Sequence, residues 1–413
     1  MWDRILDRML RAFVRTGALE IDYPDGTRRR YGPGEDPIRL KLADETLVRR
    51  LCLNTEVTVG EAYMDGTLTI EGDDLRGFLD LATRNRAIAG EPWWLRGIER
   101  LRAAFWFLRQ FNRAGRAKSN VAHHYDLSGE LYDLFLDEDR QYSCAYFPTG
   151  TETLDEAQRA KKLHIARKLL IEPGMRVLDI GCGWGGMAIT LARDFGARVV
   201  GVTLSEEQVK IARDRVAAAG LSDLVEIRLA DYRDLVERFD RIVSVGMFEH
   251  VGAPQFRTYF RKVRDLLTED GVALIHTIGR SAPPQDTGGW ITKYIFPGGY
   301  IPSMSDASAA IEKEGLWLAD IEVWRLHYAE TLRNWYERFQ AREDEARALY
   351  DERFCRMWRY YLAGCEMTFR NGRQGVFQFQ LAKKVDAVPI TRDYLYRAPE
   401  EAAAGRPESL AAE

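Results

Sequence analysis

The chain has 413 residues, which is enough for two or more domains. Its 59 lysines and arginines and 63 aspartates and glutamates give a net charge of −4, an average that says little about partners, and no nucleic-acid partner is expected. No run of about 18 apolar residues occurs, so no transmembrane helix is expected, and the first residues lack the apolar core of a signal peptide. The five cysteines show neither a CxxC pair nor a zinc-site spacing, so we expect reduced thiols, no metal and a cytoplasmic protein.

The first part of the chain, residues 1–90, predicts a small α+β domain. Apolar residues at helical spacing predict an amphipathic helix over Trp2–Val14. Residues 17–70 show alternating apolar residues and turn signals, as at Pro24-Asp25-Gly26, and predict short strands. A second helix is predicted over Leu75–Ala82.

Residues 91–119 predict a helical linker that is rich in basic and aromatic side chains. Between Trp93 and Lys118, six arginines and one lysine stand against a single acid, Glu99. The bulky aromatic residues among them are Trp93, Trp94, Phe105, Trp106, Phe107 and Phe111. A basic helix with aromatic residues suits an anionic membrane surface, but an interdomain helix packed on its own protein accounts for the same pattern. The sequence leaves both interpretations open.

Residues 120–385 show the pattern of a large α/β domain. The strand candidates are Arg176–Ile180, Arg198–Val202, Val225–Leu229, Arg241–Val245, Val272–Thr277, Leu318–Trp324 and Val376–Ala382. Helical patterns separate the first five, which predicts a doubly wound, mainly parallel, seven-stranded Rossmann-like sheet. Residues 280–312 and 327–372 are predicted additions to it. The tail, 386–413, is predicted to be disordered at its end, where Ala, Glu and Pro dominate.

The most informative motif is the glycine-rich turn after the first of these strands, Val177-Leu178-Asp179-Ile180-Gly181-Cys182-Gly183-Trp184-Gly185-Gly186. Gly181 and Gly183 let the backbone turn tightly and approach a ligand closely, because neither carries a side chain. The helix that follows offers N–H groups and the positive end of its dipole. The turn therefore predicts a nucleotide-type cofactor site at the carboxyl end of this strand.

The turn also fits G-x-G-x-x-G, so a dinucleotide must be weighed against S-adenosylmethionine (SAM). A dinucleotide site expects an acid at the end of the second strand. This chain has Thr203-Leu204-Ser205 there, and Glu206 already belongs to a helix start. Asp179 has a placement typical of SAM binding, and Asp231-Tyr232 after the third strand offers an acid and an aromatic ring for an adenine. The sequence favours SAM.

Eight segments together resemble the cyclopropane-fatty-acyl-phospholipid synthase family of SAM-dependent methyltransferases. Besides the glycine turn they are His124-Tyr125-Asp126-Leu127, Gln141-Tyr142-Ser143-Cys144-Ala145-Tyr146-Phe147, Gly201-Val202-Thr203-Leu204-Ser205, Ser244-Val245-Gly246-Met247-Phe248-Glu249-His250-Val251-Gly252, His276-Thr277-Ile278-Gly279, Tyr294-Ile295-Phe296-Pro297 and Trp335-Tyr336-Glu337-Arg338-Phe339. They occur in the family's order, and Gly60-Glu61-Ala62-Tyr63-Met64-Asp65-Gly66 resembles the family's bacterial two-domain branch. The resemblance implies phospholipid acyl chains as substrate, peripheral contact with an anionic membrane through the N-terminal domain, and a homodimer.

The resemblance also implies a set of site residues. The expected SAM contacts are Tyr142, Ser143, Asp179, Gly181, Cys182, Gly183, Thr203, Gln208, Asp231 and Tyr232. The family holds a bicarbonate ion as the base, and the matching positions are Cys144, Glu249, His276, the backbone of Ile278, and Tyr336. All these side-chain types are present, so a working site is expected.

The expected chemistry explains why such residues are needed. An isolated cis double bond is a poor nucleophile, so the sulfonium of SAM must be held in line with it, close and dry. Methyl transfer leaves a positive charge on the neighbouring carbon, which aromatic faces can stabilise. A proton must then leave the new methyl group so that the ring closes, and an oriented oxyanion can accept it. Glu249 is expected to accept a hydrogen bond from the bicarbonate hydroxyl or to orient His276.

Several alternatives stay open at this point. Cys144 has a rival interpretation as a nucleophile, although this chemistry needs no covalent enzyme intermediate. Relatives of the family give methyl-branched, methylene or hydroxylated products, so ring closure is the leading product and not the only one. A SAM-binding or lipid-binding module without catalysis would be expected to lack the base set. His123-His124 does not predict a metal site, because neighbouring histidines on a helix point apart.

Overall fold

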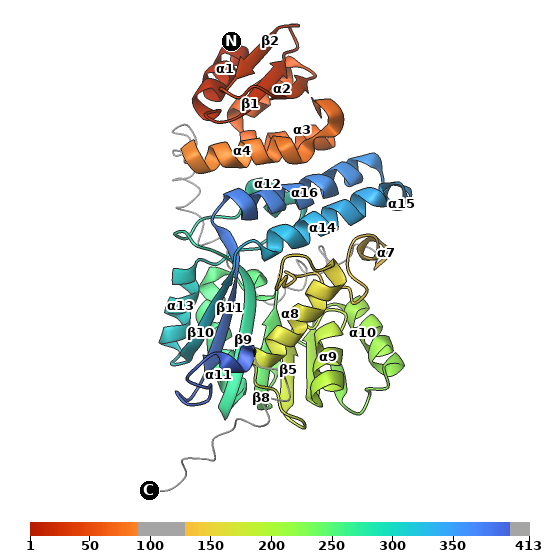
Figure 1. Ribbon diagram of the computed structural model, residues 1–413, viewed down its shortest axis with the longest axis vertical. Coiled ribbons are helices and arrows are strands. Elements are labelled where there is room, and N and C mark those ends of the chain that lie inside the picture. The colour runs from red at the N-terminus through yellow and green to blue at the C-terminus, as the bar shows by residue number, and fades with distance from the viewer. Residues whose placement is uncertain (90–128, 397–413) are drawn as a thin grey trace.

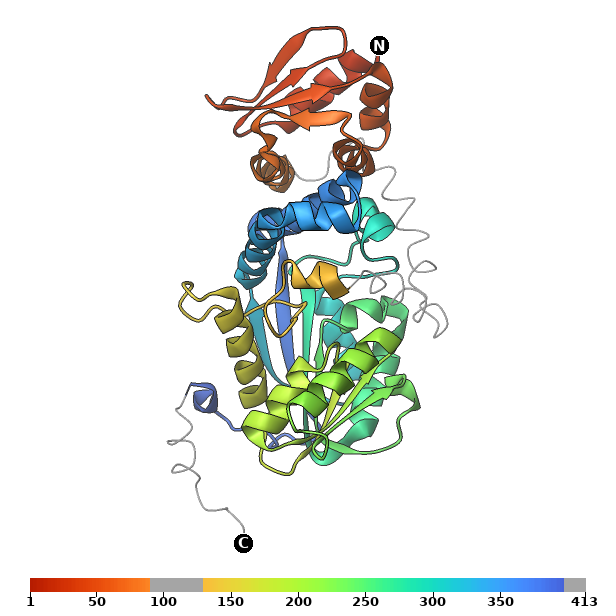
Figure 2. The same cartoon turned by 90° about the vertical axis from the view of Figure 1, so that its right-hand side faces the viewer.

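The computed structural model describes residues 1–89 and 129–396 of the chain (Figure 1). The predicted linker at 91–119, the pair His123-His124 and the end of the predicted tail, 397–413, lie outside the described residues. The N-terminal domain and a larger domain are stacked along the long axis (Figures 1 and 2). Among the described residues, no helix is both long enough and apolar enough to cross a bilayer.

The N-terminal domain is built on a four-stranded sheet in the order β2-β1-β3-β4. The strands are β1 (Ala18–Asp22), β2 (Arg28–Tyr31), β3 (Pro37–Leu42) and β4 (Leu68–Ile70). β1 pairs antiparallel with β2 and parallel with β3, and β3 pairs antiparallel with β4. The predicted first helix is α1 (Trp2–Phe13), and the later one, α4 (Leu75–Ala89), runs further than its prediction.

The prediction of short strands over residues 17–70 is wrong for residues 45–64, which form two helices. α2 (Glu45–Leu53) is capped by Asp44, whose side chain accepts a hydrogen bond from the Leu47 amide at 2.8 Å. α3 (Thr55–Met64) follows directly and packs against a helix of the larger domain, α16 (Glu352–Asn371). The alternation that suggested strands is weak evidence here, since burial of the helix faces against other elements decides the structure.

The larger domain is the predicted doubly wound sheet, with seven strands in the order β10-β11-β9-β8-β5-β6-β7. The strands are β5 (Arg176–Ile180), β6 (Arg198–Thr203), β7 (Val225–Leu229), β8 (Phe239–Val245), β9 (Leu267–Arg280), β10 (Trp317–Trp324) and β11 (Gln374–Ala382). β11 runs antiparallel to both of its neighbours, and the other paired strands are parallel. All the predicted strands are present, and β9 is longer at both ends than its apolar run indicated.

Helices cover both faces of this sheet (Figures 1 and 2). They are α8 (Leu154–Lys168), α9 (Gly186–Phe195) and α10 (Glu206–Ala218) on one face, and α11 (Phe256–Leu266) and α13 (Met304–Lys313) on the other. Val177 and Val199 pack with the first group, whereas Leu178 and Val200 pack with the second. Short elements are α7 (Gly129–Asp133), η1 (Glu71–Asp73), η2 (Tyr232–Asp234), η3 (Phe248–His250), η4 (Ala253–Gln255) and η5 (Asp393–Leu395).

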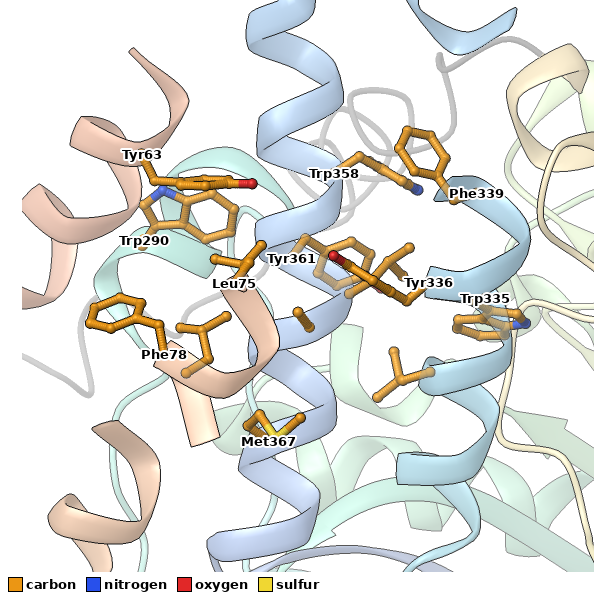
Figure 3. Close-up of a cluster of buried hydrophobic side chains, with 14 of the residues drawn as sticks. Tyr63, Leu75, Phe78, Trp290, Trp335, Tyr336, Phe339, Trp358, Tyr361 and Met367 are labelled. Atoms are coloured by element: carbon orange, nitrogen blue, oxygen red, sulfur yellow. The ribbon is translucent and has the colours of Figure 1, made fainter. Parts of the chain in front are cut away.

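A layer of helices lies between the sheet and the N-terminal domain (Figures 1 and 2). It consists of α12 (Gly289–Tyr294), α14 (His327–Ala341), α15 (Glu343–Leu349) and α16, all within the two predicted additions. Figure 3 shows side chains of the N-terminal domain and of this layer in one buried cluster. Gly60 of α3 approaches the Trp290 indole so closely that a Cβ atom there would stand 2.3 Å from its nitrogen. The two domains therefore share a hydrophobic core.

Charged side chains also join the two domains. Glu366 of α16 is fully buried and accepts hydrogen bonds from Arg76 of α4 at 2.7 and 3.0 Å and from Arg370 at 2.8 Å. Glu61 of α3 accepts a hydrogen bond from Lys293 of α12 at 2.6 Å. A buried carboxylate of this kind depends on its partners far more than an exposed one does.

Glu366→Ala is expected to destabilise the protein by about 3 kcal/mol, because it removes the buried partner of two arginines and leaves a cavity. Urea unfolding followed by circular dichroism measures the change. The matched control is Glu337→Ala, since Glu337 is an exposed partner of the same Arg76 at 3.9 Å. The control should lose less than about 1 kcal/mol. Equal losses from the two variants would contradict the buried placement of Glu366.

Candidate functional site

The glycine-rich turn leaves β5 and is tied to the neighbouring strand β6. The amides of Gly181 and Cys182 both donate to the Val202 carbonyl, at 2.9 and 3.0 Å. Gly181 has φ of 80° and Gly183 has φ of 53°, in the left-handed region where a side chain is strained. α9 begins at Gly186, so its N-terminus lies at the carboxyl edge of the sheet, as predicted for a cofactor turn.

The two side chains within this motif differ in character. Asp179 is buried at the end of β5, and its Oδ2 has no hydrogen-bond partner among the described residues. Burial raises the pKa of Asp179 to about 7. Cys182 packs on Gly201 of β6, where an added Cβ atom would lie 3.1 Å from its sulfur. Asp179 thus offers an unused polar atom to a ligand, whereas the Cys182 side chain fills space.

The ends of β6 and β7 lie on the same edge of the sheet. The Thr203 hydroxyl donates to Gln208 Oε1 at 2.7 Å, which fixes both side chains next to the turn. Asp231 accepts from the Arg233 amide at 3.0 Å, and the Tyr232 ring lies 5.5 Å from that of Tyr259. Glu206 is exposed in the first turn of α10, so no acid follows β6 in the place that a dinucleotide would need.

The segment Gln141–Ala145 lies directly against the turn. A Cβ atom on Gly186 would stand 2.4 Å from the Gln141 side chain. α8 holds the segment through Gln158, which donates to the Ser143 carbonyl at 2.9 Å, and through Lys161, which donates to the Ser143 hydroxyl at 2.7 Å. Sequence reasoning missed Lys161, because lysines on a helix are usually exposed and nothing in the local pattern marked this one as buried.

Two members of this segment face the helix layer. The Tyr142 hydroxyl is hydrogen-bonded to the Tyr361 hydroxyl at 2.7 Å, and its ring stacks on Trp335 at 5.2 Å. The Ala145 amide donates to the Thr331 hydroxyl of α14 at 3.0 Å, next to the buried Cys144. Burial raises the pKa of the Cys144 thiol above its ordinary value, so the thiol is protonated at neutral pH. This state disfavours the rival interpretation of Cys144 as a nucleophile.

Glu249 and Ile278 are brought together by a direct hydrogen bond. The Ile278 amide donates to Glu249 Oε1 at 2.6 Å, so this predicted backbone donor is engaged by the carboxylate. Glu249 Oε2 is buried and has no hydrogen-bond partner among the described residues. Burial raises the pKa of Glu249 to about 7, against the opposing effects of the Ile278 hydrogen bond and the nearby Thr277 hydroxyl. One oxygen of Glu249 is therefore held, and the other can accept a hydrogen bond from a ligand.

His276 is buried on β9 beside β11. Its Nδ1 lies 3.0 Å from the amide nitrogen of Gln378, which can only donate, so the neutral ring carries its proton on Nε2. Burial lowers the pKa of His276 well below its ordinary value, and the positive charge of Lys161 lowers it further. The imidazole is therefore neutral at physiological pH and can donate one hydrogen bond.

Tyr336 is not brought together with these residues. Its ring lies 5.8 Å from the Arg76 guanidinium, in the interface with the N-terminal domain (Figure 3). An α-helix turns by about 100° per residue, so Tyr336 points about 140° away from Thr331, whereas Tyr328 points only about 60° away. Burial raises the pKa of Tyr361 well above its ordinary value, and Tyr142 and Tyr328 raise it further. Tyr336 therefore lies in the domain interface, and its role in the base site stays a prediction; around the axis of α14, Tyr328 lies nearer than Tyr336 to the side of Thr331.

Comparison with known proteins gives this geometry a context. Residues 112–379 match the family described as mycolic acid cyclopropane synthetase, and residues 5–89 match a domain of unknown function. The chain is 38% identical to a probable fatty acid methyltransferase of Pseudomonas putida, covering 92% of this chain and 96% of that one. It is 40% identical to the cyclopropane-fatty-acyl-phospholipid synthase of Escherichia coli K12, covering 82% of this chain and 86% of that one. The structure of mycolic acid cyclopropane synthase CmaA1, complexed with SAH and CTAB, matches with a TM-score of 0.61 at 36% identity, covering 64% of this chain and 97% of that one.

Gly186→Ala tests the packing of the turn against the segment Gln141–Ala145. The added methyl group would collide with the Gln141 and Asp139 side chains, so we expect affinity for S-adenosylhomocysteine (SAH) to fall about tenfold or more while the fold is retained. Isothermal titration calorimetry measures the affinity. Gly364→Ala is the control, because a Cβ atom on this α16 glycine meets no atom within 4 Å. Unchanged affinity in Gly186→Ala would contradict the assigned cofactor turn.

Proposed function

The chain belongs to the mycolic acid cyclopropane synthetase family, and from this premise we propose that it is a cyclopropane-fatty-acyl-phospholipid synthase. It is an enzyme that depends on SAM for methyl transfer. In the proposed reaction it transfers a methylene unit to the cis double bond of an unsaturated phospholipid acyl chain, with bicarbonate as the general base. The observation that carries the proposal is the buried Oε2 of Glu249, which has no hydrogen-bond partner among residues 1–89 and 129–396 and lies at the same sheet edge as the glycine turn.

The residues at the strand ends fit SAM. Gly181 and Gly183 expose backbone, and Asp179 holds a buried polar atom that lacks a partner among the described residues. Thr203 and Gln208 add a hydroxyl and an amide at the end of β6. The proposed contacts remain those of the family resemblance, namely Tyr142, Ser143, Asp179, Gly181, Cys182, Gly183, Thr203, Gln208, Asp231 and Tyr232.

The proposed base set also fits an oxyanion. When bound, SAM supplies an electrophilic methyl group and bicarbonate accepts the proton that this group loses. The neutral His276 donates from Nε2, and Glu249 Oε2 accepts from the bicarbonate hydroxyl. The Cys144 thiol donates to the Ala145 carbonyl at 3.3 Å and would turn from it to act as a weak donor to bicarbonate. We assign the tyrosine of this set to Tyr328. The Ile278 amide acts indirectly, since it orients Glu249 through Oε1.

A related SAM-dependent fatty-acyl C-methyltransferase, with a methyl-branched or methylene product, is the second candidate. The similarity to the probable fatty acid methyltransferase of Pseudomonas putida favours it. The two candidates share the methyl-transfer step and differ in what the resulting carbocation does. Loss of a methyl proton with ring closure gives the cyclopropane, loss of a chain proton gives a methyl-branched alkene, and a hydride shift before loss of a methyl proton gives the methylene product. A base held beside the transferred methyl group favours loss of a methyl proton and ring closure.

Lipid extracts from bacteria that express the chain test the proposed function. We expect unsaturated acyl chains to gain the mass of one CH₂ group and to resist hydrogenation, because no double bond remains. A product with the same mass gain that takes up hydrogen would indicate the methylene alternative. Extracts identical to those of cells without the gene would contradict both candidates.

Glu249→Gln is the informative variant in this assay. It should lower kcat by about 100-fold or more and leave SAH affinity within about twofold, since Glu249 serves the proton transfer and not the cofactor. Because an ionised carboxylate accepts a hydrogen bond more strongly than a protonated carboxyl group does, kcat of the unmodified protein should rise as the pH increases through about 7. Glu312→Gln, at an exposed position of α13, is the control. Parallel losses of turnover and SAH affinity would contradict the assigned role.

We further propose that the enzyme docks peripherally on the cytoplasmic face of an anionic membrane, and that it is a homodimer. The surface of the N-terminal domain supports the docking. α1 exposes Met1 and Ile5, and the neighbouring α2 exposes Leu53. Exposed arginines accompany them, at Arg4 and Arg8 of α1. Apolar side chains rimmed by arginines suit an interface of acyl chains and anionic headgroups. The same proposal includes membrane contact by the predicted basic and aromatic linker, residues 91–119.

The double variant Ile5→Ser, Arg8→Glu should weaken binding to vesicles that contain anionic lipid by about tenfold, because it removes one apolar contact and reverses one charge. Co-sedimentation measures the binding. Added salt should weaken it in the unmodified protein. Arg198→Glu is the control, since Arg198 is exposed at the opposite edge of the sheet. The docking proposal would be overturned if binding were the same with neutral and anionic lipid, with and without added salt, and in the double variant.

A further inference from the structure

The proposed base set lacks a positive charge. Burial keeps Cys144 and His276 neutral, and Glu249 is itself an acid. An anion placed among them would have no counter-charge, and a buried, unpaired charge is strongly unfavourable. A site built to hold bicarbonate therefore needs a cation close by.

Lys161 of α8 is the cation that meets this need. Its side chain is fully buried, and its ammonium group donates to the Ser143 hydroxyl at 2.7 Å and to Gln141 Oε1 at 2.9 Å. An ammonium group carries three N–H donors, so these two bonds do not exhaust it. The bond to Ser143 places the ammonium group beside the neighbouring residue Cys144. Burial raises the pKa of Cys144 and lowers that of His276, and the charge of Lys161 acts to lower both.

The other charges around Lys161 are neutralised by partners of their own. Asp139, in the loop before the segment, is paired with both Lys162 and Arg215. On β10, Glu322 is paired with Lys168 at 2.6 Å and hydrogen-bonded to His164 at 2.7 Å.

Asp137 is the acid whose charge acts most directly on Lys161. It is buried, and its carboxylate accepts hydrogen bonds from the backbone amides of Gln141 and Asp139. In the described part of the chain, no carboxylate lies within ion-pair distance of Lys161 itself. Burial lowers the pKa of Lys161 to about 7, although the charge of Asp137 opposes this shift, so an anion placed beside the side chain would favour its protonated form. Among the described residues, no ion pair neutralises Lys161.

We propose that Lys161 is a positioning residue that orients the cofactor segment through Gln141 and Ser143 and supplies the counter-charge for bicarbonate beside Cys144 and His276. The counter-charge part rests on the proposed function, whereas the orienting part requires only that the protein bind SAM. Two substitutions separate these parts. Lys161→Gln keeps a hydrogen-bond donor and loses the charge, and Lys161→Met loses both at similar volume.

The measurements are SAH affinity by calorimetry and the dependence of the rate on added bicarbonate in CO₂-depleted buffer. Lys161→Met should weaken SAH binding by about fivefold and raise the half-saturating bicarbonate concentration by about tenfold or more. Compared with Lys161→Met, Lys161→Gln should regain most of the SAH affinity, but its half-saturating bicarbonate concentration should stay as high. Lys168→Met is the matched control, since Lys168 is equally buried on the same helix and its charge also acts on His276, but that charge is paired with Glu322. It should change neither quantity by more than about twofold.

Each result bears on one part of the proposal. Recovery of the bicarbonate response in Lys161→Gln would overturn the counter-charge, and unchanged SAH affinity in Lys161→Met would overturn the orienting role. Equal effects from Lys168→Met would show a general loss of helix packing and would overturn both. If the rate of the unmodified enzyme does not depend on bicarbonate, the proposed bicarbonate base is wrong, and the counter-charge role of Lys161 is wrong with it. The SAH affinity of the variants still tests the orienting role.

Discussion

The segment Gln141–Ala145 is fixed from several sides, and the site depends on it. Gln158 and Lys161 of α8 hold Ser143, and Thr331 of α14 holds the Ala145 amide. Gln141, at the start of the segment, packs on the glycine turn, and Cys144 lies near the end of the segment. The cofactor turn, the proposed base set and the helix layer are thus positioned by one short stretch of chain. Fixed geometry of this kind is what a reaction with a poor nucleophile requires, because orientation is the main contribution that the protein can make.

The helix layer gives the N-terminal domain a direct connection to this site. α14 carries Thr331 toward the segment and Tyr336 toward Arg76 of the N-terminal domain. α16 carries Tyr361 toward Tyr142 and Glu366 toward the same Arg76. Domains that share a hydrophobic core and buried polar contacts are expected to move together and not as independent units. A membrane contact on the N-terminal domain would therefore also orient the cofactor site relative to the lipid surface.

The sequence predicted the parts of the protein whose pattern is local. Strands buried on both faces appear as continuous apolar runs, and the glycine turn has few structural alternatives. The helices at 45–64 were missed because tertiary packing decides them. A sequence pattern does not give the direction of α14, so it could not decide between the predicted Tyr336 and the proposed Tyr328. Lys161 was missed because its burial arises from Gln141 and Ser143, which are distant in the sequence.

The central claim is that a base in this site removes one hydrogen from the transferred methyl group and so closes a ring. The most direct test uses SAM whose methyl group carries three deuterium atoms, with vesicles of a cis-unsaturated phospholipid and mass spectrometry of the acyl chains. The account predicts a product that retains two deuterium atoms and contains no double bond. A methyl-branched product that retains all three deuterium atoms and still contains a double bond would contradict it, because the proton would then have left the acyl chain and not the transferred methyl group.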